Sequence, residues 1–456
     1  MLQLVLGRSG SGKTQWIYER LSALVDTEED RPLLCVVPEQ FSFETERSLL
    51  EALGPHRAAR IQVLSFTRMA ETVFRSTGGF AGRRLDDSSR MLLMSRALEM
   101  TAGQLSLYTR HTADPEYISS MLSMLSELKQ CAVTPLALEK TAKALPKGTL
   151  AMKSQELSLI YGAYEALLGH TYLDPLDDLT RLAEVLPESG LLKGALLFVD
   201  AFKGFTAQEM QVLSALLNIA DTVTVTLCTD TLDDTAQGLG RFSPVIRTGL
   251  RLEQLAQRQH IPVAKPVVLS ENRRSRSEAL LRLEEESFLP DGSPLETPAD
   301  DVTLTACADI YAECTFTART IRRLLREEDA RCRDFAVVTR NLDEYRGILD
   351  AALEMEGIPY FLDTREDILT EPLVSITLCA LRCAAGWDTE LLLRLMKTGL
   401  AGFSAHSISQ LENYVLMWRI HGIGWTRDWE GNPDGLDAPF TEETAKKLDS
   451  LNRLRR

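Results

Sequence analysis

The sequence predicts an α/β fold in which a parallel sheet carries a phosphate-binding loop at one edge. Short apolar runs with strand character alternate with segments of helical spacing, and this alternation is typical of parallel sheets. The first apolar run, Leu2–Leu6, leads directly into a glycine-rich segment. At 456 residues, with 45% hydrophobic and 25% charged side chains, the chain can bury a sizeable core and divide into two or three domains.

The glycine-rich segment matches the pattern G-x-x-x-x-G-K-[ST], and helical spacing begins at Gln15. Glycines let successive backbone N–H groups face an anion, and the positive end of the helix dipole adds to the attraction. In this motif the lysine reaches the β- and γ-phosphates and the hydroxyl ligates Mg²⁺. We therefore predict that ATP and Mg²⁺ bind here, and the full pattern in context disfavours the alternative of a chance glycine–serine loop. The predicted residues are Gly7, Arg8, Ser9, Gly10, Ser11, Gly12, Lys13 and Thr14.

The next two strands are predicted at Leu33–Val37 and Ile61–Leu64, and a helical segment follows each of them. Both strands end in polar clusters, Pro38–Gln40 and Ser65–Arg68. Ligands of parallel sheets bind at the carboxyl ends of the strands. We therefore expect both clusters at the same edge of the sheet as the glycine-rich loop.

A helical stretch over residues 81–194 is predicted to be an insertion into this first domain. It contains an apolar stripe with helical spacing, which is more typical of core than of a cofactor or partner surface. The stripe consists of Tyr117, Ile118, Met121, Leu122, Leu125 and Leu128. The sheet then resumes with strands at Ala195–Val199, Val223–Leu227 and Val267–Leu269, so that residues 1–80 and 195–285 form one domain.

Asp200 directly follows a buried strand and is predicted to be the acid that helps to hold Mg²⁺. An ordinary strand-end aspartate is the alternative, because loops after apolar strands often begin with one. Many motor proteins carry a glutamate at the next position to polarise the attacking water, but here that position is Ala201, and the nearest later acid is Glu209. The metal-binding half of the site is thus predicted without its usual general base.

A joint rich in proline and acidic residues, residues 286–301, is predicted to precede a second α/β unit over residues 302–456. Its strands are expected at Val302–Ala306, Phe335–Val338 and Ile358–Phe361, with a helix through Ile321–Leu325 and further helices over 372–420. No closing strand follows, so we expect this unit to be truncated and the chain to be a fragment.

The net charge of −15 argues against a general polyanion-binding surface but allows a local basic groove. No apolar run approaches the roughly 18 residues of a membrane span, and the glycine-rich loop follows the first strand without a leader, so a cytoplasmic location is expected. The eight cysteines are scattered. Cys379 and Cys383 share a helix face, where buried thiols are favoured over metal ligands.

Six segments together resemble the AddB family, the B subunits of the bacterial AddAB helicase/nuclease. The resemblance runs over the whole 456 residues in the right order. The segments are Gly7–Thr14, Pro38–Glu46, Leu64–Ala70, Glu127–Gln130, Phe198–Phe202 and Gly357–Asp363.

The resemblance implies a superfamily 1 helicase-like P-loop NTPase. Its RecA-like domain 1A would comprise residues 1–80 and 195–285, its helical insertion 1B residues 81–194, and the start of a second RecA-like domain residues 302–456. It also implies a heterodimer with an AddA-type subunit that processes double-strand DNA ends for recombination. The family's nuclease and its four-cysteine 4Fe-4S cluster would lie beyond Arg456, so no cysteine here is assigned to a cluster.

Two segments resemble helicase motifs more closely. Asn272–Ser275 is similar to Asn-Tyr-Arg-Ser, which would make Arg274 the arginine that meets the γ-phosphate. Ser65–Ala70 is similar to Thr-Phe-His-Ser-Leu-Ala, which meets single-stranded DNA. Phe66 is expected either to stack on a base or to be buried under the following helix. The DNA-binding candidates are Gln40, Ser65, Phe66, Thr67 and Arg68.

The departures from the pattern are informative. Arg273 stands where a tyrosine would stack on adenine, Ala201 replaces the glutamate, and the Gly-Asp-Asp-Asp-Gln motif after Val223–Leu227 is not recognisable. We expect a subunit that binds nucleotide and DNA without being the main motor. Two alternatives remain: a P-loop ATPase or kinase that acts on a small molecule, which would not need the second α/β unit, and a scaffold subunit that does not hydrolyse ATP, which Ala201 favours.

Overall fold

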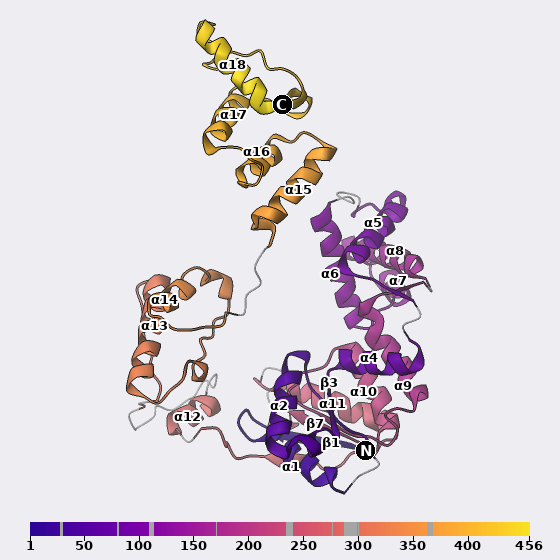
Figure 1. Cartoon of the computed structure of the whole chain (residues 1–456). Coiled ribbons are helices and arrows are strands. Elements are labelled where there is room, and N and C mark those ends of the chain that lie inside the picture. The colour runs from indigo at the N-terminus through magenta and orange to yellow at the C-terminus, as the bar shows by residue number, and fades with distance from the viewer. Residues whose placement is uncertain are drawn as a thin grey trace. The chain divides into compact units, whose positions relative to one another are not determined.

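The computed structural model describes residues 1–27, 31–79, 82–108, 114–169, 171–233, 240–275, 277–286, 299, 301–362 and 368–456. The chain divides into two units, Met1–Thr303 and Leu304–Arg456, and each is described by itself (Figure 1). Most of the expected joint, residues 287–298 and 300, and Asp363 of the last AddB-like segment lie outside the described residues.

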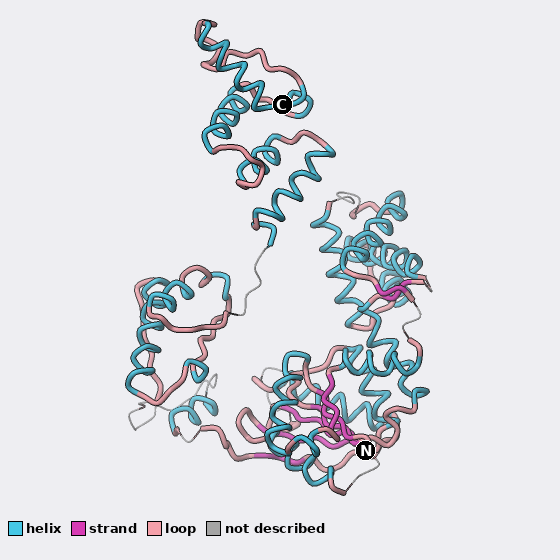
Figure 2. Tube along the Cα trace, in the orientation of Figure 1, coloured by secondary structure: helices cyan, strands magenta, loops and turns pink. Residues whose placement is uncertain are grey.

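Unit 1 is built on a six-stranded sheet in which the described strands all pair in parallel (Figure 2). Its strand order is β3-β2-β6-β7-β1-β8. All six strands expected in residues 1–285 are present, which confirms an α/β fold with a parallel sheet. Their bounds are β1 (Leu2–Gly7), β2 (Leu33–Val36), β3 (Ile61–Leu64), β6 (Leu196–Val199), β7 (Thr222–Leu227) and β8 (Val267–Leu269).

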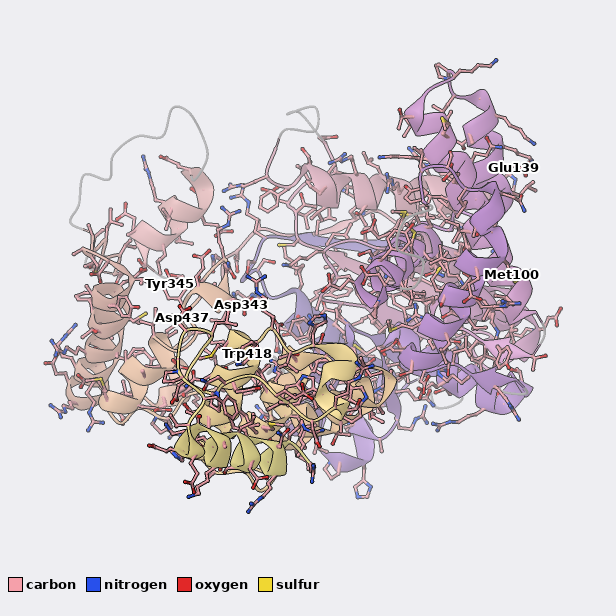
Figure 3. The ribbon with its side chains drawn as sticks, turned by 90° about the horizontal axis from the view of Figure 1, so that it is seen from above. Met100, Glu139, Asp343, Tyr345, Trp418 and Asp437 are labelled. Atoms are coloured by element: carbon pink, nitrogen blue, oxygen red, sulfur yellow. The ribbon has the colours of Figure 1, made fainter. Side chains whose placement is uncertain are left out.

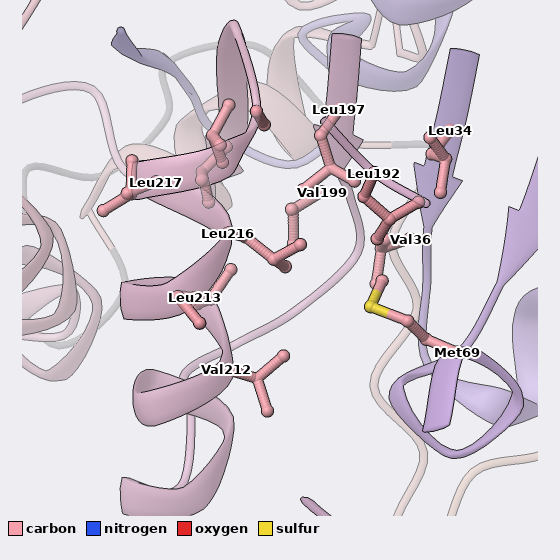
Figure 4. Close-up of a cluster of buried hydrophobic side chains, with 14 of the residues drawn as sticks. Leu34, Val36, Met69, Leu192, Leu197, Val199, Val212, Leu213, Leu216 and Leu217 are labelled. Atoms are coloured by element: carbon pink, nitrogen blue, oxygen red, sulfur yellow. The ribbon is translucent and has the colours of Figure 1, made fainter. Parts of the chain in front are cut away.

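Helices cover both faces of this sheet, because its inner strands are apolar on both sides. On β2, Leu34 and Val36 join one core, while Leu33 and Cys35 join the other. The first core is closed by helices that include α4 and α10, and Figure 4 shows Met69, Leu213 and Leu216 turned toward the strands. The second core is closed by α1 and α2. The helices are α1 (Lys13–Val25), α2 (Ser42–Leu53), α3 (Pro55–Ala58), α4 (Phe66–Thr77), α10 (Ala207–Ile219), α11 (Ser243–Arg258) and α12 (Glu278–Glu286).

The expected helical insertion is helical and has a core of its own. Of the predicted stripe, Ile118, Met121, Leu122 and Leu125 are buried, which confirms it as core. A two-stranded ribbon of β4 and β5 was not expected, because two residues are too few to show a strand period. The elements are β4 (Arg83–Arg84), α5 (Asp87–Thr101), α6 (Pro115–Gln130), α7 (Pro135–Ala144), α8 (Thr149–Leu168), β5 (Tyr172–Leu173) and α9 (Asp178–Ser189).

The last helix of this stretch, α9, returns to the sheet: Leu182 and Leu186 are buried in the same core as α4 and α10. A groove within the insertion is lined by Met100 of α5, Glu139 of α7 and residues of α8 (Figure 3). The helices that form this groove are not those at the sheet edge that carries the glycine-rich loop.

A buried ionic cluster joins α6 to α8 and to the segment before α9. The Lys129 ammonium, with 2% of its side chain exposed, lies 2.7 Å from Asp177, 2.8 Å from Glu165 and 3.2 Å from Asp174. Burial alone would lower the pKa of Lys129, but the three carboxylates outweigh it and raise this pKa. Burial raises the pKa of Asp177 to about 6, against the opposing attraction of Lys129.

Three expectations for the segments after residue 301 were wrong. Val302–Ala306, Phe335–Val338 and Ile358–Phe361 were expected to be strands, but the described part of the chain after residue 301 contains none. A strand needs a neighbour that accepts its ladder hydrogen bonds, and no backbone hydrogen bond joins these three segments in the described residues. Most of their apolar side chains lie in solvent instead, with Leu304 and Val338 at 99% and 90% exposed, whereas Ile358 is buried against α13 and α14.

The helices expected in unit 2 are present. Its two clusters of buried side chains are formed by α13 and α14 and by α15 to α18. Cys379 and Cys383 are buried on α15, 4% and 7% exposed, in line with their interpretation as core thiols. None of the described helices is both long enough and apolar enough to cross a membrane. The bounds are α13 (Ile310–Glu327), α14 (Leu349–Met355), α15 (Pro372–Ala385), α16 (Thr389–Lys397), α17 (Ala405–Met417) and α18 (Glu442–Arg455).

Candidate nucleotide site

The glycine-rich loop joins β1 to the N-terminus of α1 at the carboxyl edge of the sheet, where β1 lies between β7 and the outermost strand β8. Gly10 and Gly12 have φ of 80° and 87°, a left-handed conformation that favours glycine. Gly7 is required for another reason, because a Cβ there would lie 2.2 Å from the Ser11 hydroxyl oxygen. That hydroxyl is buried and has no hydrogen-bond partner among the described residues. The loop therefore has the tight curl that its glycine pattern predicts.

Lys13 folds back over this curl. Its ammonium donates hydrogen bonds to the carbonyl oxygens of Gly7, at 2.8 Å, and Arg8, at 2.9 Å. Burial lowers the pKa of Lys13 and the charge of Arg274 adds to this effect, whereas Cys228, Asp200 and Glu284 oppose it. The loop's own carbonyls thus hold the ammonium at the centre of the loop, where an anion on the N–H groups would meet it.

Thr14 and Asp200 are brought together from positions 186 residues apart. The Thr14 hydroxyl donates to Asp200 Oδ2 at 2.7 Å, and the hydroxyl of Thr226 on β7 donates to the other carboxylate oxygen. Asp200 is only 5% exposed and follows β6, two strands away from β1. Thr226 was not expected from the sequence, since a threonine inside a strand carries no signal of its own.

The position after Asp200 has an unusual backbone. Ala201 is exposed with φ of 65°, a conformation that costs a residue with a Cβ about 1–2 kcal/mol. Glu209 is committed elsewhere: it forms a capping box with Thr206 at the start of α10, with its carboxylate 2.7 Å from the Thr206 backbone nitrogen. Neither position thus supplies a carboxylate that is free to activate water.

The segment after β8 lies against the loop. β8 pairs with the end of β1, so that Leu269 is opposite Gly7. The backbone N–H of Arg273 donates to the Gly10 carbonyl at 2.8 Å, and the Arg274 guanidinium donates to the Ser9 hydroxyl at 3.3 Å. Arg274 is therefore beside the loop, 265 residues away from Ser9 in sequence.

Arg8, the arginine within the loop itself, is already paired. The Arg8 guanidinium lies 2.7 Å from the Asp230 carboxylate and 5.8 Å from the centre of the Phe242 ring. Arg241 lies 5.1 Å from the same ring. This group could not be expected from the sequence, because its members are separated by loops of no fixed spacing.

The DNA-binding candidates lie at the same edge but farther along it. β2 is three strands from β1, about 14 Å at the usual strand spacing, and β3 is one strand beyond. Gln40 and Thr67 are exposed. Ser65 is buried as the N-cap of α4, where its hydroxyl accepts from the Arg68 backbone N–H at 3.1 Å and donates to Glu39.

Arg68 is not a free cation. Its guanidinium lies 3.3 Å from Glu39 and 3.2 Å from Glu46. Phe66 is 4% exposed and packs on Phe202 and Phe205, with ring centres 5.4 and 6.4 Å away. Of the two alternatives for Phe66, the structure has the buried one, because the first turn of α4 directs this ring into the core. In this conformation the Phe66 ring therefore cannot stack on a base.

The family model and the relatives that match this chain all indicate the same family. The family model described as "ADDB, N-terminal" matches residues 4–284. Proteins of Acetivibrio thermocellus, Thermoanaerobacter pseudethanolicus and Desulforudis audaxviator are 34%, 33% and 35% identical over all of this chain. Each of them is named as the B subunit of an ATP-dependent helicase/deoxyribonuclease. The chain covers 40%, 40% and 41% of their lengths, so it corresponds to less than half of such a protein.

Proposed function

Because the chain belongs to the AddB family, we propose that it is the nucleotide- and DNA-binding N-terminal part of the B subunit of an ATP-dependent helicase/deoxyribonuclease. The complex would process double-strand DNA ends for recombinational repair in the cytoplasm. The relatives are named as one subunit of an enzyme, which supports a partner, and for this partner we propose an AddA-type subunit. Family membership argues against a kinase that acts on a small molecule.

One observation carries the nucleotide part of this proposal: Thr14 and Asp200 converge at 2.7 Å beside the loop that holds Lys13. The backbone N–H groups at the start of α1 and the Lys13 ammonium would take the phosphates, and Arg274 would meet the terminal one. We propose Gly7–Thr14 and Arg274 as the ATP-binding residues.

The hydroxyl of Thr14 and the carboxylate of Asp200 suit Mg²⁺, which prefers oxygen ligands and often binds through one or two protein groups together with phosphates. The described residues offer no cluster of three or more metal-binding side chains that could hold an ion alone. Mg²⁺ bound here would neutralise phosphate charge. The protein's own part is to fix the two oxygens in position.

The helicase architecture is also proposed. The parallel sheet with the loop after β1 supports a RecA-like domain 1A formed by residues 1–80 and 195–285, with residues 81–194 as the helical insertion 1B. Residues 302–456 would begin a second RecA-like domain, although their described part forms helices and no strand. Gln40, Thr67 and Arg68 remain the proposed contacts to single-stranded DNA, since they are exposed at the strand ends.

A role in binding rather than turnover fits the site best. Ala201 carries no carboxylate and Glu209 is used as a helix cap. A scaffold subunit that binds ATP without hydrolysing it is therefore the second candidate, and it differs from the first only in turnover.

The test is nucleotide affinity. Lys13→Ala removes a charge-assisted phosphate contact and should weaken Mg·ATP binding about ten- to a hundredfold in isothermal titration calorimetry. Lys153→Ala, which removes an exposed lysine on α8, is the matched control and should change nothing. Equal affinities for the wild type and Lys13→Ala would refute the nucleotide site.

A further inference from the structure

The segment Asn272–Ser275 is fixed against the glycine-rich loop by more than one contact. Arg273 is anchored through its backbone N–H to the Gly10 carbonyl at 2.8 Å. The Asn272 side-chain oxygen accepts from the backbone N–H groups of Arg274 and Ser275, at 2.9 and 3.1 Å, which holds the turn. The position of both arginines therefore follows from the backbone and not only from their long side chains.

Each arginine passes over one of the two left-handed glycines. A Cβ built on Gly12 would lie 3.1 Å from Arg273 Cδ and 3.5 Å from its Nε and Nη1. A Cβ on Gly10 would lie 2.9 Å from Arg274 Cβ. The guanidinium of Arg273 thus lies directly on the last glycine before Lys13, at the start of α1.

Arg273 has no other structural task in the described part of the chain. Its side chain is exposed and forms no hydrogen bond or ion pair with a described residue, whereas Arg274 bonds Ser9 and Arg8 pairs with Asp230. The nearby acid Glu284 accepts a hydrogen bond from the Asn272 amide at 3.1 Å. Arg273 is therefore an available planar donor beside the backbone N–H groups of the loop.

The described contacts of the loop include no unoccupied aromatic ring on which a nucleobase could stack. Among the described contacts of the loop, the one aromatic ring is Phe242, and the guanidinium groups of Arg8 and Arg241 already lie against it, 5.8 and 5.1 Å from its centre. The group on the loop that is free to approach a ligand is a cation, which attracts phosphate and gives no hydrogen-bond pattern specific to adenine.

We infer that this site selects the triphosphate and not the base, and that Arg273 is the residue that determines this preference by adding a phosphate contact over Gly12. The inference rests on the proposed nucleotide site and extends it to a ligand class: nucleoside triphosphates of any base, and inorganic tripolyphosphate. A site discriminates strongly between bases only where its own polar groups are left unpaired by the wrong base, and the free side chain that the structure places on this loop, Arg273, is suited to phosphate.

The experiment compares affinities of the full chain for Mg·ATP, Mg·GTP and Mg·tripolyphosphate by isothermal titration calorimetry. We expect the three dissociation constants to agree within about threefold, because only the phosphates are recognised. Arg273→Ala should weaken all three by about tenfold, the effect of one lost charge-assisted contact, and Arg273→Lys should recover part of the loss. Arg20→Ala, which removes an exposed arginine of α1 away from the loop, should leave all three unchanged.

Two results would overturn the inference while the nucleotide site stands: ATP binding more than about tenfold tighter than both other ligands, or an Arg273→Ala variant with unchanged affinity for tripolyphosphate. The absence of binding by all three ligands to the wild type would overturn the proposed nucleotide site itself, and the inference with it. The two failures are therefore distinguishable in one set of titrations.

Discussion

Ala201 shows how one residue limits the chemistry of this site. It follows Asp200, where a carboxylate would be needed to activate water, and its φ of 65° is unfavourable for any residue with a Cβ. A general base contributes about 10²–10⁴-fold to a rate, so we expect ATP turnover by the purified chain to be weak or absent. Ala201→Glu should not restore it, because the side chain would start from a strained backbone. A steady-state phosphate-release assay with and without single-stranded DNA measures this, and robust DNA-stimulated turnover would contradict it.

The same backbone predicts a stability effect. Ala201→Gly should stabilise unit 1 by up to about 1 kcal/mol in urea unfolding, because glycine adopts the left-handed conformation without a steric cost. Ala23→Gly is the control: Ala23 is exposed within α1, where glycine costs about 1 kcal/mol. If both substitutions destabilised equally, the strain at Ala201 would be ruled out.

At the scale of elements, the start of α4 carries Arg68, whose guanidinium is paired with the carboxylates of Glu39 and Glu46. A phosphate must displace Glu39 and Glu46 from Arg68, which lowers the gain from the contact. We expect Arg68→Ala to weaken single-strand binding and to lower its salt slope by about one phosphate contact. Glu46→Gln should strengthen binding, because it removes one of the two carboxylates that hold the guanidinium, whereas Glu51→Gln, also on α2, should not. Fluorescence anisotropy over a salt series is the measurement, and unaltered affinity and slope in Arg68→Ala would exclude this segment from the DNA path.

The cluster around Lys129 predicts a pH effect. The pKa of Asp177 is raised to about 6 in the folded chain, above its ordinary value of 3.8, so the folded state binds this proton more tightly than the unfolded state. The stability that Asp177 contributes is then present below about pH 4 and lost as pH rises through about 6. The difference in unfolding free energy between wild type and Asp177→Asn should fall over this window, by at most about 3 kcal/mol. Urea unfolding at several pH values tests this, and a constant difference would show that Asp177 titrates normally.

A strand could be predicted from the sequence where its own residues are enough to determine it. The runs Leu2–Leu6 and Leu196–Val199 are buried almost throughout, so their predominantly apolar residues were a sufficient signal. The segments Phe335–Val338 and Ile358–Phe361 have similar composition but form no ladder in the described residues. Strand formation depends on a neighbouring strand, and sequence pattern cannot supply that neighbour.

At the scale of the whole molecule, the site was predictable only in its local part. The loop Gly7–Thr14 follows from a contiguous motif, and Asp200 from a strand end. Thr226, the anchoring of Arg273 on Gly10 and the acids that hold Arg68 depend on which strands become neighbours. A parallel sheet fixes that order through crossovers far apart in sequence, so these contacts leave no local pattern.

The two units have separate cores: every buried cluster of the described residues belongs wholly to Met1–Thr303 or to Leu304–Arg456. Nucleotide binding should therefore stabilise unit 1 and leave the unfolding of unit 2 unchanged. Of the five tryptophans, only Trp16 is in unit 1, so in a Trp16→Phe variant the fluorescence reports unit 2 alone, through buried Trp425 and Trp429 among others.

At a Mg·ATP concentration about a hundredfold above the dissociation constant, the stabilisation should be about 2.7 kcal/mol. We expect the circular dichroism of the Trp16→Phe variant to show one transition that moves to higher temperature with nucleotide, while its tryptophan fluorescence transition stays in place. At the same nucleotide concentration, adding Lys13→Ala should reduce the stabilisation to about 0.4–1.4 kcal/mol and the shift in proportion, because the stabilisation acts through the loop after β1. A fluorescence transition that moves together with the circular dichroism would mean that the binding energy is shared by both units, and that they unfold as one.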